Sequence, residues 1–471
     1  MSATVKKAVL YVVLVAALSL LAVAGGLSAP QVLSVAVFSS FIIGTLLFWP
    51  FRLAFALVGI AVLLASGLLD VPHLIEFASL DVILFLVGMM IIIGYLENNH
   101  FFEALLEKVL PYIGGSAKKL MVALLAISFV SAALVDEVTS ILFMSAIMLR
   151  ICRHYKLNPV PFIIMVVFAT NIGSSATVVG NPIGVLIALR AGLAFPDFLR
   201  WATPISLAAW VVTVLLSFVF FRKPMAQLQQ AIDAQRETGS ELAAAGGEGE
   251  ARPAGNFALP LVIFLGTIIG LLSHKSVEHL LGLDHNVMLV GTALLFAGIV
   301  LFIEREKARD LVEKRVDWWT LAFFMLLFAS AGTLRYVGVT EEIAKGIIHL
   351  TGGEIVPLVW IVTWGIGILS AFMDNVLAVA SFIPIVGDLQ NIGVNVFPLW
   401  WAMLFGGTIM GNLTLVGSTA NIIAVGLLER RENKHITFME WFWPGLVTAV
   451  PSLLLALVLL LVQLPLLLSA G

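Results

Sequence analysis

Apolar runs of about membrane-spanning length recur along nearly the whole chain of 471 residues. A helix needs about 20 apolar residues to cross a bilayer core. Hydrophobic residues make up 61% of the sequence and charged residues only 12%, which leaves too little polar surface to cover a large soluble core. We therefore predict an all-helical, polytopic membrane protein with eleven transmembrane spans, near residues 8–25, 32–48, 53–69, 80–97, 157–187, 204–221, 257–273, 287–303, 318–335, 397–428 and 444–467.

Two further apolar segments, 119–149 and 355–388, are predicted to enter and leave the membrane from the same side. Each is long enough to turn back, and each carries acidic residues near its middle: Asp136 and Glu137 in the first, Asp374 in the second. Irregular backbone at membrane depth is tolerated only where protein or a water-filled cavity covers it. We interpret both segments as re-entrant hairpins with acidic tips.

The two longest spans are each interrupted by a cluster of small and polar residues. The clusters read TNIGSSATVVGNP at 170–182 and GNLTLVGSTANII at 411–423. Such sequences are typical of broken helices, whose hydroxyls, amide oxygens and free carbonyls suit hard cations and small hydroxylated solutes. The candidate substrate- or ion-binding residues from tips and clusters are Asp136, Glu137, Thr139, Asn171, Ser174, Ser175, Thr177, Asn181, Asp374, Asn375, Asn412, Thr414, Ser418, Thr419 and Asn421.

The sequence of the first hairpin tip recurs in the second. AALVDEV at 132–138 matches SAFMDNV at 370–376, at an offset of 238 residues (370 − 132) that we call the repeat offset. The repeat offset also carries Gly94 onto Gly332. An odd number of spans separates the two copies, so the second copy is predicted to be inverted, with the two tips meeting near the middle of the membrane. Inverted repeats suit alternating access, because each half can adopt the conformation of the other.

The distribution of charge predicts the orientation of the chain. With the N-terminus in the cytoplasm, 21 of the 26 Lys and Arg residues lie on the cytoplasmic side, as the positive-inside rule requires. The five on the outer side are Arg190, Arg200, Lys275, Arg335 and Lys345. We expect a multi-pass protein of the cytoplasmic (inner) membrane, in contact with the lipid bilayer, with tryptophans near span ends such as Trp401 and Trp441 as interfacial anchors.

A polar segment divides the chain into three parts. Residues 222–256 are rich in Ala, Gly and Glu and are predicted to form a cytoplasmic linker whose first part is able to form a helix. The first repeat would then cover residues 1–221, with the hairpin that opens to the cytoplasm. The second would cover residues 257–471, with the hairpin that opens to the outside.

The acidic tips indicate transport of ions or protons. A charged side chain at the centre of a bilayer costs about 3 kcal/mol or more unless a cation, a proton or converging amides compensate it. A structural role as helix caps is the alternative for Asp136 and Asp374, and the role of Glu137 stays open. If the ion is Na⁺, its ligands would come from Asp136, Asn171, Asp374 and Asn412.

Motifs for other classes of membrane protein are absent from the sequence. It holds no GxxxxGK[ST] loop for nucleotide hydrolysis and no HExxH or GxSxG motif. We therefore predict a secondary transporter, not an enzyme, with no cofactor and no nucleic-acid partner; a channel is the alternative. The single Cys152 excludes a multi-cysteine metal site.

At these motifs the chain resembles the ion transporter superfamily, in the group of ArsB-type arsenite pumps, NhaD-type sodium/proton antiporters and the P protein. The segments that carry the resemblance are SAALVDEVTSILFM, NPVPFIIMVVFATNIGSSATVVGNP, SAFMDNVLAVA and GNLTLVGSTANIIAVG, and it covers about residues 80–430. The resemblance implies a homodimer whose protomers each hold a scaffold and a transport part that moves as an elevator.

The resemblance leaves the substrate open. Proton-coupled export of arsenite or antimonite is the first expectation, and an ATPase subunit would then be a further partner. The first alternative is Na⁺(Li⁺)/H⁺ antiport, in which the cation and protons compete for the same carboxylates. A sodium-coupled carboxylate transporter is a weaker alternative, because fixed negative charge at the tips would repel a dianion.

Overall fold

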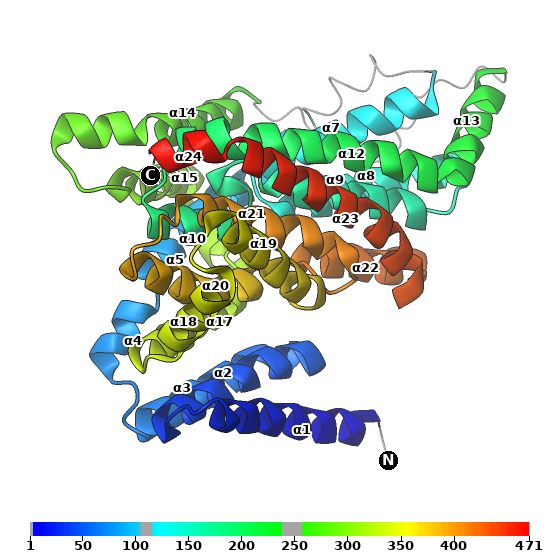
Figure 1. Ribbon diagram of the computed structural model, residues 1–471. Coiled ribbons are helices and arrows are strands. Elements are labelled where there is room, and N and C mark those ends of the chain that lie inside the picture. Colours follow the sequence, from blue (N-terminus) through cyan, green and yellow to red (C-terminus); the bar gives the residue numbers. More distant parts are fainter. Residues whose placement is uncertain (1–2, 103, 105–114, 238–256, 471) are drawn as a thin grey trace.

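The computed structural model describes residues 3–102, 104, 115–237 and 257–470, and all regular secondary structure in these residues is helical (Figure 1). Ten described helices are long and apolar enough to cross a membrane. Eight of them coincide with predicted spans, and the other two, Ala117–Leu134 and Ile355–Phe372, are the first arms of the predicted hairpins. The chain is therefore an all-helical, multi-pass membrane protein.

Eight helices form what we call the frame. Each half contributes four of them, and the last of the four packs against the other half. In the first half α5 packs against α15, and in the second half α17 packs against α3. An additional helix, α1 (Ala3–Ala24), packs on α2. The frame helices are α2 (Ala29–Leu47), α3 (Arg52–Ala65), α4 (Val71–Phe77), α5 (Leu80–Asn98), α14 (Ala258–Leu281), α15 (Val287–Glu304), α16 (Ala308–Arg315) and α17 (Trp318–Tyr336).

Both predicted hairpins are present, each as two helices joined by a sharp turn. The first consists of α7 (Ala117–Leu134) and α8 (Glu137–His154), and the second of α19 (Ile355–Phe372) and α20 (Asn375–Asn391). The repeat offset carries α7 onto α19 from end to end. In both turns an aspartate precedes the second helix and accepts a hydrogen bond from a backbone N–H of its first turn, which compensates an N–H that the helix itself leaves unpaired.

Both predicted broken helices are present as well. The first consists of α9 (Val160–Ser174), the 3₁₀ turn η3 (Val178–Gly180) and α10 (Pro182–Ala191). The second consists of α21 (Phe397–Met410), the 3₁₀ turn η7 (Gly411–Leu413) and α22 (Thr419–Glu432). At each break a glycine, Gly180 or Gly417, lies against the backbone of the preceding segment so closely that a Cβ atom would overlap it.

The remaining elements cover these parts. The long helices α12 (Thr203–Phe220) and α23 (Phe438–Val462) pack against each other and against the broken helices. The short elements are η1 (Trp49–Phe51), α11 (Phe195–Asp197), the π-helical turn η4 (Phe198–Ala202), η6 (Arg305–Lys307), α18 (Val339–Thr351) and α24 (Leu464–Ala470).

The first part of the predicted linker is a docked helix. Helix α13 (Arg222–Glu237) buries Leu228 in an apolar cluster with α7 residues, and the Gln229 side chain accepts a hydrogen bond of 2.8 Å from the backbone N–H of Ala117. The rest of the predicted linker, 238–256, lies outside the described residues. The start of the segment between the two halves is therefore packed against the first hairpin.

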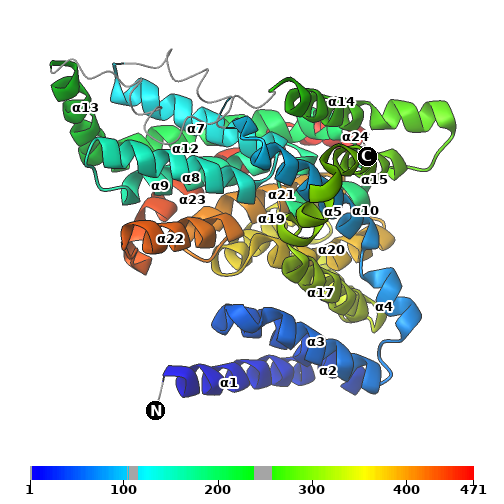
Figure 2. The same cartoon turned by 180° about the vertical axis from the view of Figure 1, so that it is seen from behind.

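The helices separate into two groups along the length of the molecule. Helices α7, α8, α9, α13 and α22 gather at the end where the N-terminus lies, on the right of Figure 1. Helices α4, α5, α10, α14, α15, α17 and α20 gather at the opposite end, and Figure 2 shows the same separation from behind. The first break joins α9 of one group to α10 of the other.

Candidate functional site

The tips of the two hairpins meet, as their sequences predict. The Asn375 side-chain amide approaches both carboxylate oxygens of Glu137, with Nδ2 at 3.4 Å from Oε1 and 3.5 Å from Oε2. Glu137 is 2% exposed and Asn375 1%. Two residues that are far apart in the chain and occupy equivalent places in their halves thus contact each other in the interior of the protein.

Glu137 also contacts the first broken helix. The Ser174 hydroxyl lies 3.1 Å from Glu137 Oε2, and the Asn181 amide donates to the same hydroxyl at 2.8 Å. Asn181 in addition begins α10, because its side-chain oxygen accepts from the Gly184 N–H. Glu137 therefore faces the meeting point of tips and breaks, which the sequence alone left open.

The two aspartates differ in their surroundings. Asp374 is 5% exposed; it caps α20 through the Val376 N–H at 3.0 Å and accepts a 2.6 Å hydrogen bond from the Thr419 hydroxyl at the start of α22. Asp136 is only partly buried and caps α8 through the Thr139 N–H at 2.8 Å. Asp374 therefore joins the second hairpin to the second break, while the hydrogen bond of Asp136 stays within its own hairpin.

Four polar side chains form what we call the asparagine cluster: Asn171, Asn412, Ser418 and Asn421. Asn171 donates to Asn412 Oδ1 at 2.7 Å and to Asn421 Oδ1 at 2.8 Å, which joins the two broken helices. Asn421 donates both amide hydrogens to backbone carbonyls of its own break, those of Gly411 and Thr414. All members are fully buried, and the amide hydrogens of Asn171 and Asn421 are used within the protein.

Three predicted site residues serve instead to attach the breaks to their neighbours. The Ser175 hydroxyl pairs with Ser206 of α12 at 2.7 Å. The Thr177 hydroxyl donates to the Ala133 carbonyl at the end of α7, and Thr414 makes the equivalent bond to Ala371 at the end of α19. The two threonine hydroxyls fix each break to the first arm of its own hairpin.

Basic side chains of the described residues are not bonded to the acids of the site. Within the described ranges, no Lys, Arg or His side chain forms a hydrogen bond or ion pair with Asp136, Glu137 or Asp374. Arg52 interacts electrostatically with Asp374, but its guanidinium donates to Thr320. The described residues also contain no group of three or more His, Cys, Asp or Glu placed to hold a metal ion.

The sequence missed one part of the site's support. Because Trp441 lies near the end of a predicted span, the sequence predicts it to be an interfacial anchor. This prediction is wrong: Trp441 is fully buried, and its Nε1 donates to the Asn412 carbonyl at 3.0 Å. Trp401 is likewise fully buried. Helix α23 begins at Phe438, ahead of the predicted span, which places Trp441 inside the bundle. No local sequence signal distinguishes the two environments.

Two acid-tipped hairpins that meet between two broken helices are the layout of the secondary transporters of the ion transporter superfamily. A family model described as "Citrate transporter" matches residues 45–406 and 287–469. The chain belongs to this family, and its superfamily is the one that the sequence motifs predict.

Individual relatives agree with this class. An uncharacterized transporter of Mycobacterium tuberculosis is 32% identical over 81% of this chain and 85% of its own length. The human P protein is 24% identical over 83% of this chain and 54% of its own length. Among solved structures, the YdaH transporter of Alcanivorax borkumensis shares the fold, with a TM-score of 0.56 and 16% identity over 84% of this chain and 90% of that chain.

Proposed function

We propose that the protein exchanges a small monovalent cation for protons at the meeting hairpin tips. The observation that carries this proposal is that Glu137 and Asp374 are buried and interact electrostatically, while no basic side chain of the described residues is bonded to either. Buried carboxylates stay ionised only when a positive charge compensates them, and otherwise bind a proton. A cation and protons would therefore compete for these two side chains, and this competition couples their movements.

The hydrogen bonding of the asparagine cluster favours a cation over arsenite or antimonite. A neutral trihydroxide would need free amide and hydroxyl groups, but the amide hydrogens of Asn171 and Asn421 already bind protein oxygens. A cation instead needs oxygen atoms, which Glu137, Asp374 and the carbonyls of the breaks supply. Asp136, at the edge of the site, would attract the cation towards the tips.

Citrate is the second candidate, because the matching family model is described as a citrate transporter. A bare citrate anion would meet the carboxylates of both tips, and like charges at close range repel. We propose that citrate would be accepted only with its charge neutralised by bound cations.

We also propose that the two hairpins and the two broken helices move as one body, here called the moving unit, relative to the frame. The bonds of Thr177, Thr414 and Asn171 support this division, because they tie the members of the unit to one another. We further propose that the two halves are inverted repeats, that the N-terminus lies in the cytoplasm of the cell, and that the frames of two protomers form a homodimer.

The proposal is tested with purified protein in liposomes that contain a pH-sensitive dye and carry an imposed proton gradient. Sodium, lithium, arsenite, antimonite and citrate, with and without magnesium, are added in turn. Proton movement with sodium or lithium is expected. A response to the metalloids alone would contradict cation exchange, and a response to citrate alone would replace it by the second candidate.

A further inference from the structure

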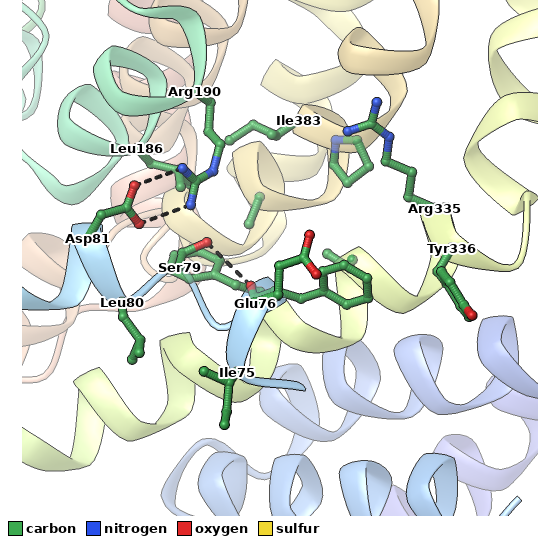
Figure 3. A pocket seen from close by; sticks show the side chains of 16 residues that line it. Ile75, Glu76, Ser79, Leu80, Asp81, Leu186, Arg190, Arg335, Tyr336 and Ile383 are labelled. Atoms are coloured by element: carbon green, nitrogen blue, oxygen red, sulfur yellow. Dashed lines mark hydrogen bonds and ion pairs between the residues drawn. The ribbon is translucent and has the colours of Figure 1, made fainter. Parts of the chain in front are cut away.

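Two ion pairs join the frame to the moving unit, and both lie at the end of the molecule opposite the N-terminus. Arg190 at the end of α10 binds Asp81 of α5 with two hydrogen bonds, of 2.8 and 3.1 Å. Arg335 at the end of α17 binds Asp388 of α20 at 3.0 Å. Both arginines line a cavity of about 640 Å³ between the frame and the moving unit, with Arg190 directed at Asp81 (Figure 3).

The Arg335–Asp388 pair is closely fitted. Asp388 is 6% exposed, and its second carboxylate oxygen accepts from the Thr340 hydroxyl of α18. The guanidinium lies over Gly387, where a Cβ atom would be 3.3 Å from Arg335 Cζ. The frame and the second hairpin are therefore in direct, specific contact at this end.

The residues at the equivalent positions of the first half carry the opposite charges. The repeat offset carries Arg335 back onto Glu97 and Asp388 back onto Arg150. The same offset carries α17 back onto α5 from end to end. Gly332 of α17 lies against Phe77 of α4, and Gly94 of α5 lies against Arg315 of α16, which is the residue that the offset matches to Phe77. The frame of the first half thus holds the acid and its hairpin holds the base.

This second pair is not formed in the present structure. Glu97 instead accepts a 2.9 Å hydrogen bond from Arg315, which belongs to the frame. Arg150 is exposed and has no ion pair among the residues that the structure describes. Arg153 of the same helix binds Glu432 of α22, so this bond stays within the moving unit. In the described part of the chain, ion pairs between frame and moving unit therefore occur at one end only.

We infer that Arg335–Asp388 and Glu97–Arg150 are the two settings of one charge latch, of which only one setting is closed at a time. The inference rests on the proposed motion of the moving unit. In inverted repeats the opposite conformation is reached when each half adopts the geometry of the other. Glu97 would then leave Arg315 and bind Arg150, while Arg335 and Asp388 separate.

Pairs of cysteines test the latch in a Cys152→Ala background, which removes the only native thiol. The pairs are Arg335→Cys with Asp388→Cys, and Glu97→Cys with Arg150→Cys. The matched control is Arg153→Cys with Glu432→Cys, which joins two parts of the moving unit. Each variant is reconstituted, assayed for transport, treated with a short bifunctional thiol reagent that contains a disulfide, and scored for cross-linking on gels.

The first pair is expected to cross-link in the resting protein, and the second during turnover. Each cross-link should abolish transport, and reduction of the reagent should restore it. The control should cross-link and continue to transport. If the second pair never cross-links in a variant that transports, or cross-links without loss of transport, the latch is overturned. Absence of transport by the wild type with every solute tested would count against the proposed function alone, because the cross-link of the first pair in the resting protein is scored without transport.

Discussion

At the scale of single residues, the candidate site is marked by carboxylates that have no bonded basic side chain among the described residues. Among the described residues, the hydrogen-bond partners of Glu137 are an amide and a hydroxyl, from Asn375 and Ser174. Asp374 has one hydroxyl and one backbone N–H. Asp388, by contrast, is paired with Arg335. Buried acids of similar exposure thus have different surroundings, and under the proposed function only the acids without a bonded basic side chain would exchange a cation for a proton.

Replacing either unpaired acid by its amide should strongly reduce coupled transport. We expect Glu137→Gln and Asp374→Asn to lower cation-driven proton movement by about 10- to 100-fold, since each removes a charged partner worth about 1.5–3 kcal/mol. Asn is also a good N-cap, so Asp374→Asn keeps α20 capped. The measurement is the initial rate in proteoliposomes at several pH values.

The control for this pair is Glu278→Gln. Glu278 is buried in α14, far along the chain from the tips, and accepts a hydrogen bond from the Met288 N–H. Its rate and pH profile should stay close to those of the wild type. Unchanged transport in both Glu137→Gln and Asp374→Asn would remove these residues from the site.

At the scale of elements, the broken helices are held open by side chains that replace missing helical hydrogen bonds. Asn421 donates to the carbonyls of Gly411 and Thr414 at the break, and Thr414 also accepts from the Gly417 N–H at 3.3 Å. The side chains of Asn158 and Asn395 likewise compensate backbone groups at helix starts, because each accepts a hydrogen bond from the backbone N–H two residues later. Polar residues in an apolar segment are therefore required by the backbone as well as by function.

Asn421→Ala should destabilise the protein. The substitution removes the side-chain donor to the carbonyls of Gly411 and Thr414, and of these Thr414 keeps the Gly417 N–H at 3.3 Å. We expect a loss of about 1–3 kcal/mol. A lower midpoint of thermal unfolding in detergent is the expected result. The exposed residue Asn99, whose amide donates to the Tyr95 carbonyl, provides the control, and Asn99→Ala should change stability by no more than about 0.5 kcal/mol. Equal midpoints for the two variants would contradict the role given to Asn421.

Gly417→Ala should disrupt the second break. A Cβ atom at Gly417 would overlap the Gly411 backbone, which cannot shift without opening the break. We expect a loss of stability of about 1–3 kcal/mol, as for other overpacked sites, together with loss of transport. Gly426 lies in α22 with no atom within 4 Å of its Cβ position, so Gly426→Ala should be neutral or stabilising by up to about 1 kcal/mol. Full transport by Gly417→Ala would mean that the close contact is not needed.

At the scale of the whole molecule, the two halves are equivalent in their elements but not in their contacts. Helix α17 packs against α20, and α5 packs against α10, so the frame touches the moving unit through elements at the end opposite the N-terminus. If that end faces the outside, as the charge distribution predicts, the frame and the proposed moving unit are in contact on the outer side.

Labelling of single cysteines from either side of the membrane tests the proposed inversion. Asn158 and Asn395 are exposed and lie in equivalent loops that follow the first and second hairpins. In a Cys152→Ala background, Asn158→Cys should react with a membrane-impermeant thiol reagent only from the cytoplasm, and Asn395→Cys only from outside. Labelling of both from the same side would contradict inverted repeats.

The sequence by itself determined the elements of this protein. Apolar length locates membrane helices because lipid offers no partner for polar groups. Acids and Gly-rich clusters inside such runs, at 132–138 and 411–423 for example, locate turns and breaks for the same reason. The repeat offset also predicted that the two tips meet, since equivalent parts of the halves come together at their shared axis.

Only the tertiary structure decided which polar groups remain free for a solute. Asn171 and Asn421 are indistinguishable from ligands in the sequence, yet their amide hydrogens are used in joining the broken helices. Likewise, Trp441 has the local sequence of an interfacial anchor but supports the Asn412 carbonyl from within the bundle. Hydrogen-bond partners from distant segments become defined only when the chain has folded, so a sequence pattern can locate a polar centre but cannot apportion its donors and acceptors.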